Sequence, residues 1–143
     1  MKFWDSSAIV PLLIQQGRTS QAQSLYKEDP LVMLWWGSDV ECTGTIARLV
    51  GEGALGRSEE QAAFERLGEL QHEAHEIQPS AKLQQIAKRL LRTHILRSAD
   101  ALQLAAVLSA NELSLSSLPF VCFDERLGLV AQREGLRLAE LVK

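Results

Sequence analysis

Two short, uninterrupted apolar runs constrain the fold of this 143-residue chain more than any other feature. Residues 31–35 read Leu-Val-Met-Leu-Trp and follow an Asp29-Pro30 break, while residues 119–123 read Pro-Phe-Val-Cys-Phe. Runs of this length without polar alternation are typical of strands buried on both faces, as in parallel sheets. We expect residues 2–5, at the N-terminus, to form another such strand.

The segments between these runs carry apolar residues at helical spacing. Strands that alternate with helices predict the α/β class, as a three-layer α/β/α sandwich around a mostly parallel sheet. We expect residues 1–143 to form one domain, because this length suits a single core. A five-helix bundle is the alternative, and the short apolar runs argue against it. The expected helices span 6–16, 20–28, 39–52, 58–75, 99–113 and 124–134, one more begins at 80, and short strands are expected at 77 and 136–138.

The composition is that of an ordinary globular chain, with 46% hydrophobic and 23% charged residues. No apolar run approaches the roughly 20 residues of a membrane span, and no signal peptide is recognisable. Cys42 and Cys122 lack metal-type spacing and are expected to be free thiols. These features predict a cytoplasmic protein. The formal net charge of -3 disfavours a basic nucleic-acid coating protein but not an enzyme with an acidic site.

Four acidic residues stand close to places where a strand gives way to a helix. Asp5 and Asp124 directly follow predicted strands, and Glu41 comes a short turn after one. Asp100 lies in the first turn of a helix with no obvious strand before it. Parallel strands end at one edge of the sheet, where ligands bind. Carboxylates gathered there repel by about 4 kcal/mol per pair at 4 Å, so the cluster predicts a divalent cation such as Mg²⁺ or Mn²⁺.

Each acid also has an ordinary structural explanation. Asp5 and Asp124 suit helix N-caps. Ser38-x-x-Glu41 has the form of a capping box. Asp100 is favourable in a first helical turn because of the helix dipole. These explanations account for the acids one at a time, whereas the recurrence of the arrangement along the chain favours a shared metal site.

Four motifs carry a family resemblance, in order and spacing. They are Asp5-Ser6-Ser7, Glu41 on the third expected helix, Ser98-Ala99-Asp100-Ala101-Leu102-Gln103-Leu104-Ala105, and Phe123-Asp124-Glu125-Arg126-Leu127. Together they resemble the PIN-domain family, and the chain length is similar to that of VapC-type toxins. The resemblance covers essentially the whole chain. One departure is Cys122-Phe123 before Asp124, where the family often has a Thr or Ser hydroxyl.

The resemblance implies a Mg²⁺- or Mn²⁺-dependent endoribonuclease that hydrolyses RNA phosphodiester bonds. By the same resemblance, Asp5, Asp100 and Asp124 would bind the metal, Glu41 would act directly or through water, and Ser6 would be an accessory polar group. The implied partners are an RNA substrate, a cognate antitoxin and a second copy of the chain in a homodimer. Two alternatives remain: a non-catalytic RNA- or protein-binding PIN-like module, and a phosphatase of another α/β fold.

A basic segment precedes Asp100. Residues 82–97 contain basic side chains and no acid, in a chain that is acidic overall. They could contact an RNA backbone or simply form a solvated helix face, and the sequence leaves both open. For Trp35-Trp36 we expect core and strand-edge positions rather than base stacking. The candidate RNA-binding residues are Lys88, Arg89, Arg92 and Arg97.

Overall fold

A computed structural model, which describes residues 1–140, contains a four-stranded sheet in the order β3-β2-β1-β4. All neighbouring strands in it are parallel, which confirms the predicted α/β class. Phe3 lies opposite Met33 on one side and Phe120 on the other. Leu138 adds only an isolated parallel bridge to Phe120, not the short strand expected over 136–138. The strands are β1 (Lys2–Trp4), β2 (Val32–Trp35), β3 (His75–Ile77) and β4 (Phe120–Val121).

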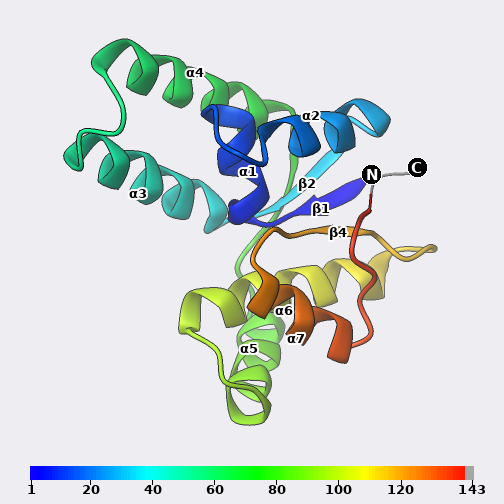
Figure 1. The fold of residues 1–143 in the computed structure, drawn as a ribbon. Helices are drawn as coiled ribbons and strands as arrows, with labels where there is room; N and C mark the ends of the chain where they lie inside the picture. Colours follow the sequence, from blue (N-terminus) through cyan, green and yellow to red (C-terminus); the bar gives the residue numbers. More distant parts are fainter. Residues whose placement is uncertain (141–143) are drawn as a thin grey trace.

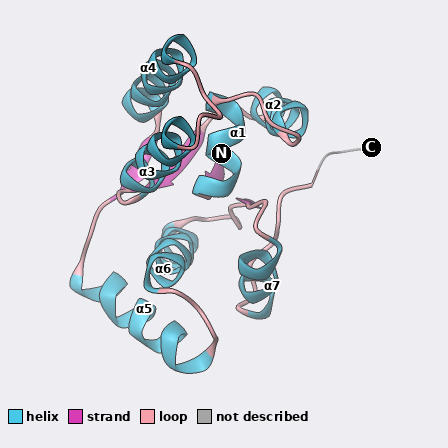
Figure 2. Ribbon diagram, turned by 60° about the vertical axis from the view of Figure 1, so that its left-hand side comes forward, coloured by secondary structure: helices cyan, strands magenta, loops and turns pink. Residues whose placement is uncertain are grey.

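Helices cover both faces of the sheet, as the three-layer prediction requires. Figures 1 and 2 show α1 to α4 on one face and α5 to α7 on the other. Within residues 1–140 no helix has the length and apolar character needed to cross a membrane. The helices are α1 (Ser6–Leu13), α2 (Thr19–Glu28), α3 (Ser38–Gly51), α4 (Arg57–Glu73), α5 (Ala81–Thr93), α6 (Ser98–Leu113) and α7 (Glu125–Arg133).

β1, β2 and β4 each contribute to two hydrophobic clusters, one on each face of the sheet, whereas β3 adds only Ile77 to one of them. Phe3 belongs to the cluster beneath α5 to α7, and the next residue, Trp4, to the cluster beneath α1 to α4. Leu34 and Trp35 of β2 divide in the same way. Successive side chains of a strand point to opposite faces. A strand covered on both faces must therefore be apolar at every position, which explains the uninterrupted runs in the sequence.

Several predicted helix starts are wrong in detail. α3 begins at Ser38 with Gly37 as its N-cap, so Ser38 does not form the expected capping box. Its Oγ instead donates a hydrogen bond of 3.0 Å to Oε1 of the buried Gln103. α6 likewise begins at Ser98 and is preceded by Arg97, without a side-chain cap. At Ser80 the prediction is confirmed, because its Oγ accepts the Leu83 N–H at 3.1 Å.

Candidate active site

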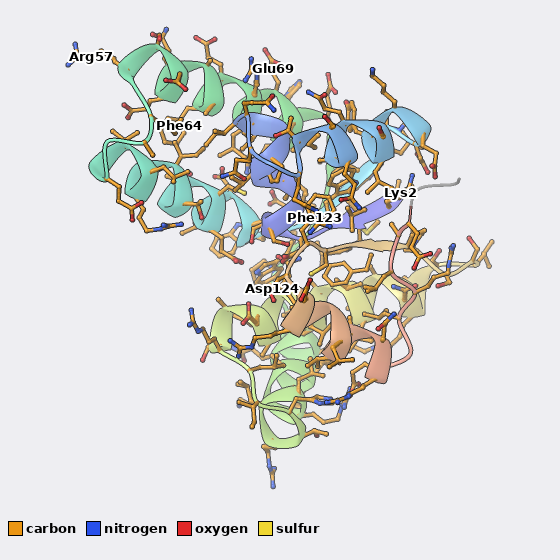
Figure 3. All side chains as sticks on the ribbon, viewed as in Figure 1. Lys2, Arg57, Phe64, Glu69, Phe123 and Asp124 are labelled. Atoms are coloured by element: carbon orange, nitrogen blue, oxygen red, sulfur yellow. The ribbon has the colours of Figure 1, made fainter. Side chains whose placement is uncertain are left out.

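The carboxyl ends of neighbouring strands bring Asp5 and Asp124 to the same edge of the sheet. Asp5 follows β1, and Asp124 comes soon after β4, which pairs with β1. Both are N-caps, since Asp5 accepts the Ser7 N–H at 3.1 Å and Asp124 accepts the Arg126 N–H at 3.0 Å. The helices α1, α3, α6 and α7 all begin at this end of the sheet (Figure 1), and Figure 3 places Asp124 at the start of α7.

Ser7 orients Asp5, a role that the sequence did not reveal. Its Oγ donates to Asp5 Oδ2 and accepts the Phe123 N–H at 2.9 Å, so one hydroxyl ties the end of β1 to the segment after β4. A hydroxyl two residues after an aspartate often bonds locally in this way, and that spacing was the available signal. The Cys122 thiol lies 3.7 Å from Asp5 Oδ2, and burial and the Asp5 charge raise its pKa, so it stays protonated.

Burial and like charge together raise the pKa of Asp5. The side chain is buried, with 4% of the residue exposed. Burial is the largest cause of the raised pKa, and the charges of Asp100 and Asp124 add to it, while the Ser7 hydrogen bonds oppose it. A buried carboxylate with further carboxylates nearby resists ionisation unless a cation offsets its charge.

Glu41 approaches this group from the start of α3. Its Oε2 accepts a hydrogen bond of 3.1 Å from Ser6 Oγ, so the structure joins the two residues that the sequence had separately nominated. Burial, then the charge of Asp5, raises the pKa of Glu41 to about 7, and the Asp100 charge contributes further. Ser38 donates its hydrogen bond to Gln103 and does not form a capping box with Glu41. The Glu41 carboxylate instead lies close enough to Asp5 and Asp100 for their charges to raise its pKa.

Asp100 completes the group from the first turn of α6. Its pKa is raised by burial and by the charge of Asp124, while the guanidinium groups of Arg97 and Arg126 oppose the rise. Arg126, in the first turn of α7, is a further cation beside the acids that sequence reasoning missed. Its place within the motif around Asp124 was the only signal. We name Asp5, Glu41, Asp100 and Asp124 together the acid cluster.

The acid cluster suits a divalent cation in its chemistry. In the part of the chain that the structure describes, every member keeps at least one carboxylate oxygen without a hydrogen-bond donor. Oxygen donors of this kind are what Mg²⁺ and Mn²⁺ prefer. As the side chains stand, no three Asp, Glu, His or Cys groups among residues 1–140 converge closely enough to hold one ion. Binding would therefore draw the carboxylates together.

The structure divides the basic segment into separate environments. Arg97 lies at the N-cap of α6, beside Asp100. Arg89 instead pairs with Glu134 at 2.7 Å. Glu134 is the C-cap of α7, about 15 Å along the helix axis from Asp124, so Arg89 is directed away from the acid cluster. Lys88 and Arg92 are exposed on α5, and their contact with RNA stays a prediction.

These features identify the protein as a parallel α/β sandwich with a PIN-like fold, in which acidic residues lie at the carboxyl edge of the sheet. Among solved structures the chain is similar to VapC20 of Mycobacterium tuberculosis, described as a toxin that cleaves the sarcin–ricin loop. The TM-score is 0.69, the match covers 90% of this chain and 94% of the other, and 18% of the residues are identical. This likeness confirms the predicted fold. No protein-family model matches the sequence, and neither does any curated protein.

Proposed function

We propose that the protein is a Mg²⁺- or Mn²⁺-dependent endoribonuclease and the toxin of a VapBC-type toxin–antitoxin pair. The observation that carries the proposal is the acid cluster, in which burial, together with neighbouring like charges, raises the pKa values of Asp5, Glu41 and Asp100. Stability alone gives no reason to gather four acids at one sheet edge. The fold likeness to an RNA-cleaving toxin supports the same assignment.

Asp5, Asp100 and Asp124 would hold the metal, with Glu41 acting directly or through water. A divalent cation bound there supplies charge stabilisation at the scissile phosphate and lowers the pKa of a bound water. Ser7 holds the Asp5 carboxylate in place, and Ser6 holds Glu41. Without metal, Glu41 has a pKa of about 7, so in that state it can take up a proton and release it again near neutral pH.

Arg97 and Arg126 would contact the phosphates of the RNA. Both guanidinium groups lie close enough to Asp100 to lower its pKa, so they flank the acid cluster. Guanidinium donors match phosphate oxygens in geometry and charge. They would offset the repulsion between the acids and the RNA backbone while the substrate is being positioned.

The proposal includes partners and a cellular location. A ribonuclease of this kind requires an inhibitor in the cell that makes it, and we infer a cognate antitoxin that covers the acid cluster. We also infer a homodimer and a cytoplasmic location. Expression of the chain alone should slow growth, and co-expression of an adjacent antitoxin gene should relieve the effect.

Cleavage of RNA in Mn²⁺ tests the proposal, with Asp100→Asn as the disabled variant. The wild type should cleave and Asp100→Asn should not. Glu125→Gln is a matched control, because it removes an exposed acid from the first turn of α7 and should leave cleavage intact. If all three proteins bind RNA and none of them cleaves it, the non-catalytic module would be favoured. Hydrolysis of a phosphomonoester without RNA cleavage would favour the phosphatase.

A further inference from the structure

A half-open cavity lies at the carboxyl edge of the sheet, between elements that adjoin or carry members of the acid cluster. Its volume is about 460 Å³, within the range of small-molecule sites. The end of β2, the segment between β3 and α5, the start of α5 and the second turn of α6 all contribute to its wall. None of the described residues that line it has an ionisable side chain.

Two tryptophans form the aromatic part of this cavity. Trp35 is 5% exposed and belongs to the core, whereas Trp36 is 49% exposed. Their rings meet edge to face, with centroids 6.2 Å apart. This matches the core and strand-edge positions expected from the sequence. However, Trp36 remains about half open to solvent, so its ring is available for the base stacking that the sequence did not lead us to expect.

The local backbone holds Trp36 in this exposed position. Its N–H donates to the Ile77 carbonyl at 3.0 Å, which anchors it to β3. The next residue is Gly37, where an added Cβ would lie 2.4 Å from Trp35 Nε1. Only glycine therefore lets the chain turn from β2 into α3 directly over the Trp35 indole. The ring of Trp36 is attached to a fixed backbone, as a preorganised binding surface requires.

The cavity shares its structural elements with the acid cluster. Trp36 precedes the N-cap of α3, the helix that carries Glu41, and Leu102 lies two residues after Asp100 on α6. β2 pairs directly with β1, the strand that ends at Asp5. Neighbouring strands are about 4.8 Å apart. A chain bound across the acids would therefore reach the cavity with its next unit.

We infer that this cavity binds an unstacked nucleobase of the RNA substrate, next to the scissile phosphodiester, with Trp36 as the stacking platform. The inference rests on the proposed ribonuclease function. Single-stranded RNA is recognised largely by stacking of splayed bases on aromatic side chains. The uncharged lining suits a base and offers no cationic side chain to a phosphate.

Polar groups at the cavity wall can read the edge of the base. Gln84 contributes a side-chain amide, with both a donor and an acceptor. Ser80 Oγ already accepts the Leu83 N–H, so its own hydrogen is available to a ligand. Together with Trp36 they provide a stacking face and hydrogen-bonding groups in one cavity, as base recognition requires.

Binding of a fluorescent ten-nucleotide single-stranded RNA tests the inference, with Ca²⁺ in place of Mg²⁺ and intact RNA verified on a gel. Trp36→Ala and Trp36→Leu should each weaken binding by about 5- to 150-fold, the measured range for base–aromatic stacking. Trp36→Phe keeps a ring and should stay within a few-fold of wild type. Leu113→Ala, which truncates an exposed apolar residue at the far end of α6, should bind as wild type does.

An abasic oligomer of the same length separates the base from the backbone. Wild type and Trp36→Ala should bind it equally. Equal binding of the base-bearing RNA by these two proteins would overturn the inference. So would wild-type affinity in Trp36→Leu, the result expected if the cavity takes an apolar side chain of a protein partner.

Failure of the proposed function gives a different result. A wild type that cleaves no RNA in Mn²⁺ would refute the ribonuclease. Binding that depends on Trp36 would still support the base site in that case, because the binding assay does not require cleavage.

Discussion

The two ends of α7 show opposite electrostatic arrangements. At its start, Asp124 joins other acids, and its charge helps to raise the pKa values of Asp5 and Asp100. At its end, Glu134 accepts hydrogen bonds from Arg89 and pairs with His94 at 2.7 Å, and these contacts lower its pKa. Asp124 stabilises the helix as its N-cap, but its acidic neighbours repel it, whereas the neighbours of Glu134 attract it. We infer from this contrast that capping alone does not explain the acid cluster.

The largest expected effect comes from removing the charge at the start of α7, with removal of the charge at its end as the comparison. Asp124→Asn should reduce RNA cleavage by on the order of 100-fold or more, as loss of a charged group at a reacting centre does. It should leave the helix intact, because asparagine caps as well as aspartate. Glu134→Gln should cleave as wild type does. Initial rates on one RNA check both variants, and equal losses would mean that the two ends do not differ in function.

The pH dependence of stability should identify Glu41. Its pKa is raised from 4.5 to about 7, so the folded protein holds the proton more tightly than the unfolded chain does. Stability from this group is therefore full below pH 4.5 and is lost as the pH rises through 7. The loss should be about 2 kcal/mol after solvent screening.

Urea unfolding of the metal-free protein at pH 5 and pH 8 measures this loss. Glu41→Gln should remove most of the pH dependence that the wild type shows. Glu69→Gln removes an exposed glutamate on α4 and should keep the wild-type dependence. Parallel pH profiles for wild type and Glu41→Gln would contradict the raised pKa.

The Glu134 end should behave in the opposite way. The pKa of Glu134 is lowered on folding. Its contribution to stability is therefore full above the pKa of the unfolded chain and is lost as the pH falls through the pKa of the folded protein. Glu134→Gln should cost about 1 kcal/mol of unfolding free energy at pH 7. Asp100→Asn should cost nothing in the absence of metal and should stabilise slightly. Thermal or urea unfolding of both variants checks the signs, and destabilisation of both would remove the contrast between the two ends.

The smallest expected effect concerns the arginines. Arg97→Gln and Arg126→Gln should each weaken RNA binding a few-fold and reduce the salt slope of single-strand binding by about 0.7, the value for one lost phosphate contact. Arg89→Gln should change neither, since its guanidinium is bound to Glu134. Affinities at four salt concentrations decide the matter. An equal change in all three slopes would mean that Arg89 contacts RNA as well, despite its pairing with Glu134.

The sequence predicted β1, β2 and β4 well because burial on both faces leaves a direct trace in the residue pattern. It predicted β3 only at residue 77 and placed His75 in the preceding helix, since β3 is short and only partly buried. Asp5, Glu41 and Asp124 were nominated by the same reasoning, since strand ends in a parallel sheet must share an edge. Asp100 has no strand directly before it, and its place in the group came from the family resemblance.

The role of Ser38 could not be predicted in this way. Its hydroxyl could bond either to the backbone of α3 as a cap or to a distant side chain. Only the tertiary structure brings Gln103, 65 residues away, close enough to accept its hydrogen bond.

The surroundings of the acids were predicted less completely than the acids themselves. Ser7 gains its role from the Phe123 N–H, which lies far from it in the sequence. Arg126 faces Asp100 only because α6 and α7 begin at the same end of the sheet. The basic segment looked uniform, yet Glu134 engages Arg89 and separates it from Arg97. Long-range partners of this kind leave no local pattern.

The melting temperature with and without Mn²⁺ tests the metal site most directly. A ligand raises stability only when it binds the folded state more tightly than the unfolded one. Wild type and Glu134→Gln should both gain about 3 °C or more in saturating Mn²⁺, whereas Asp100→Asn should gain almost nothing. A wild-type melting curve that is indifferent to Mn²⁺, with Asp100→Asn less stable than wild type, would contradict the account.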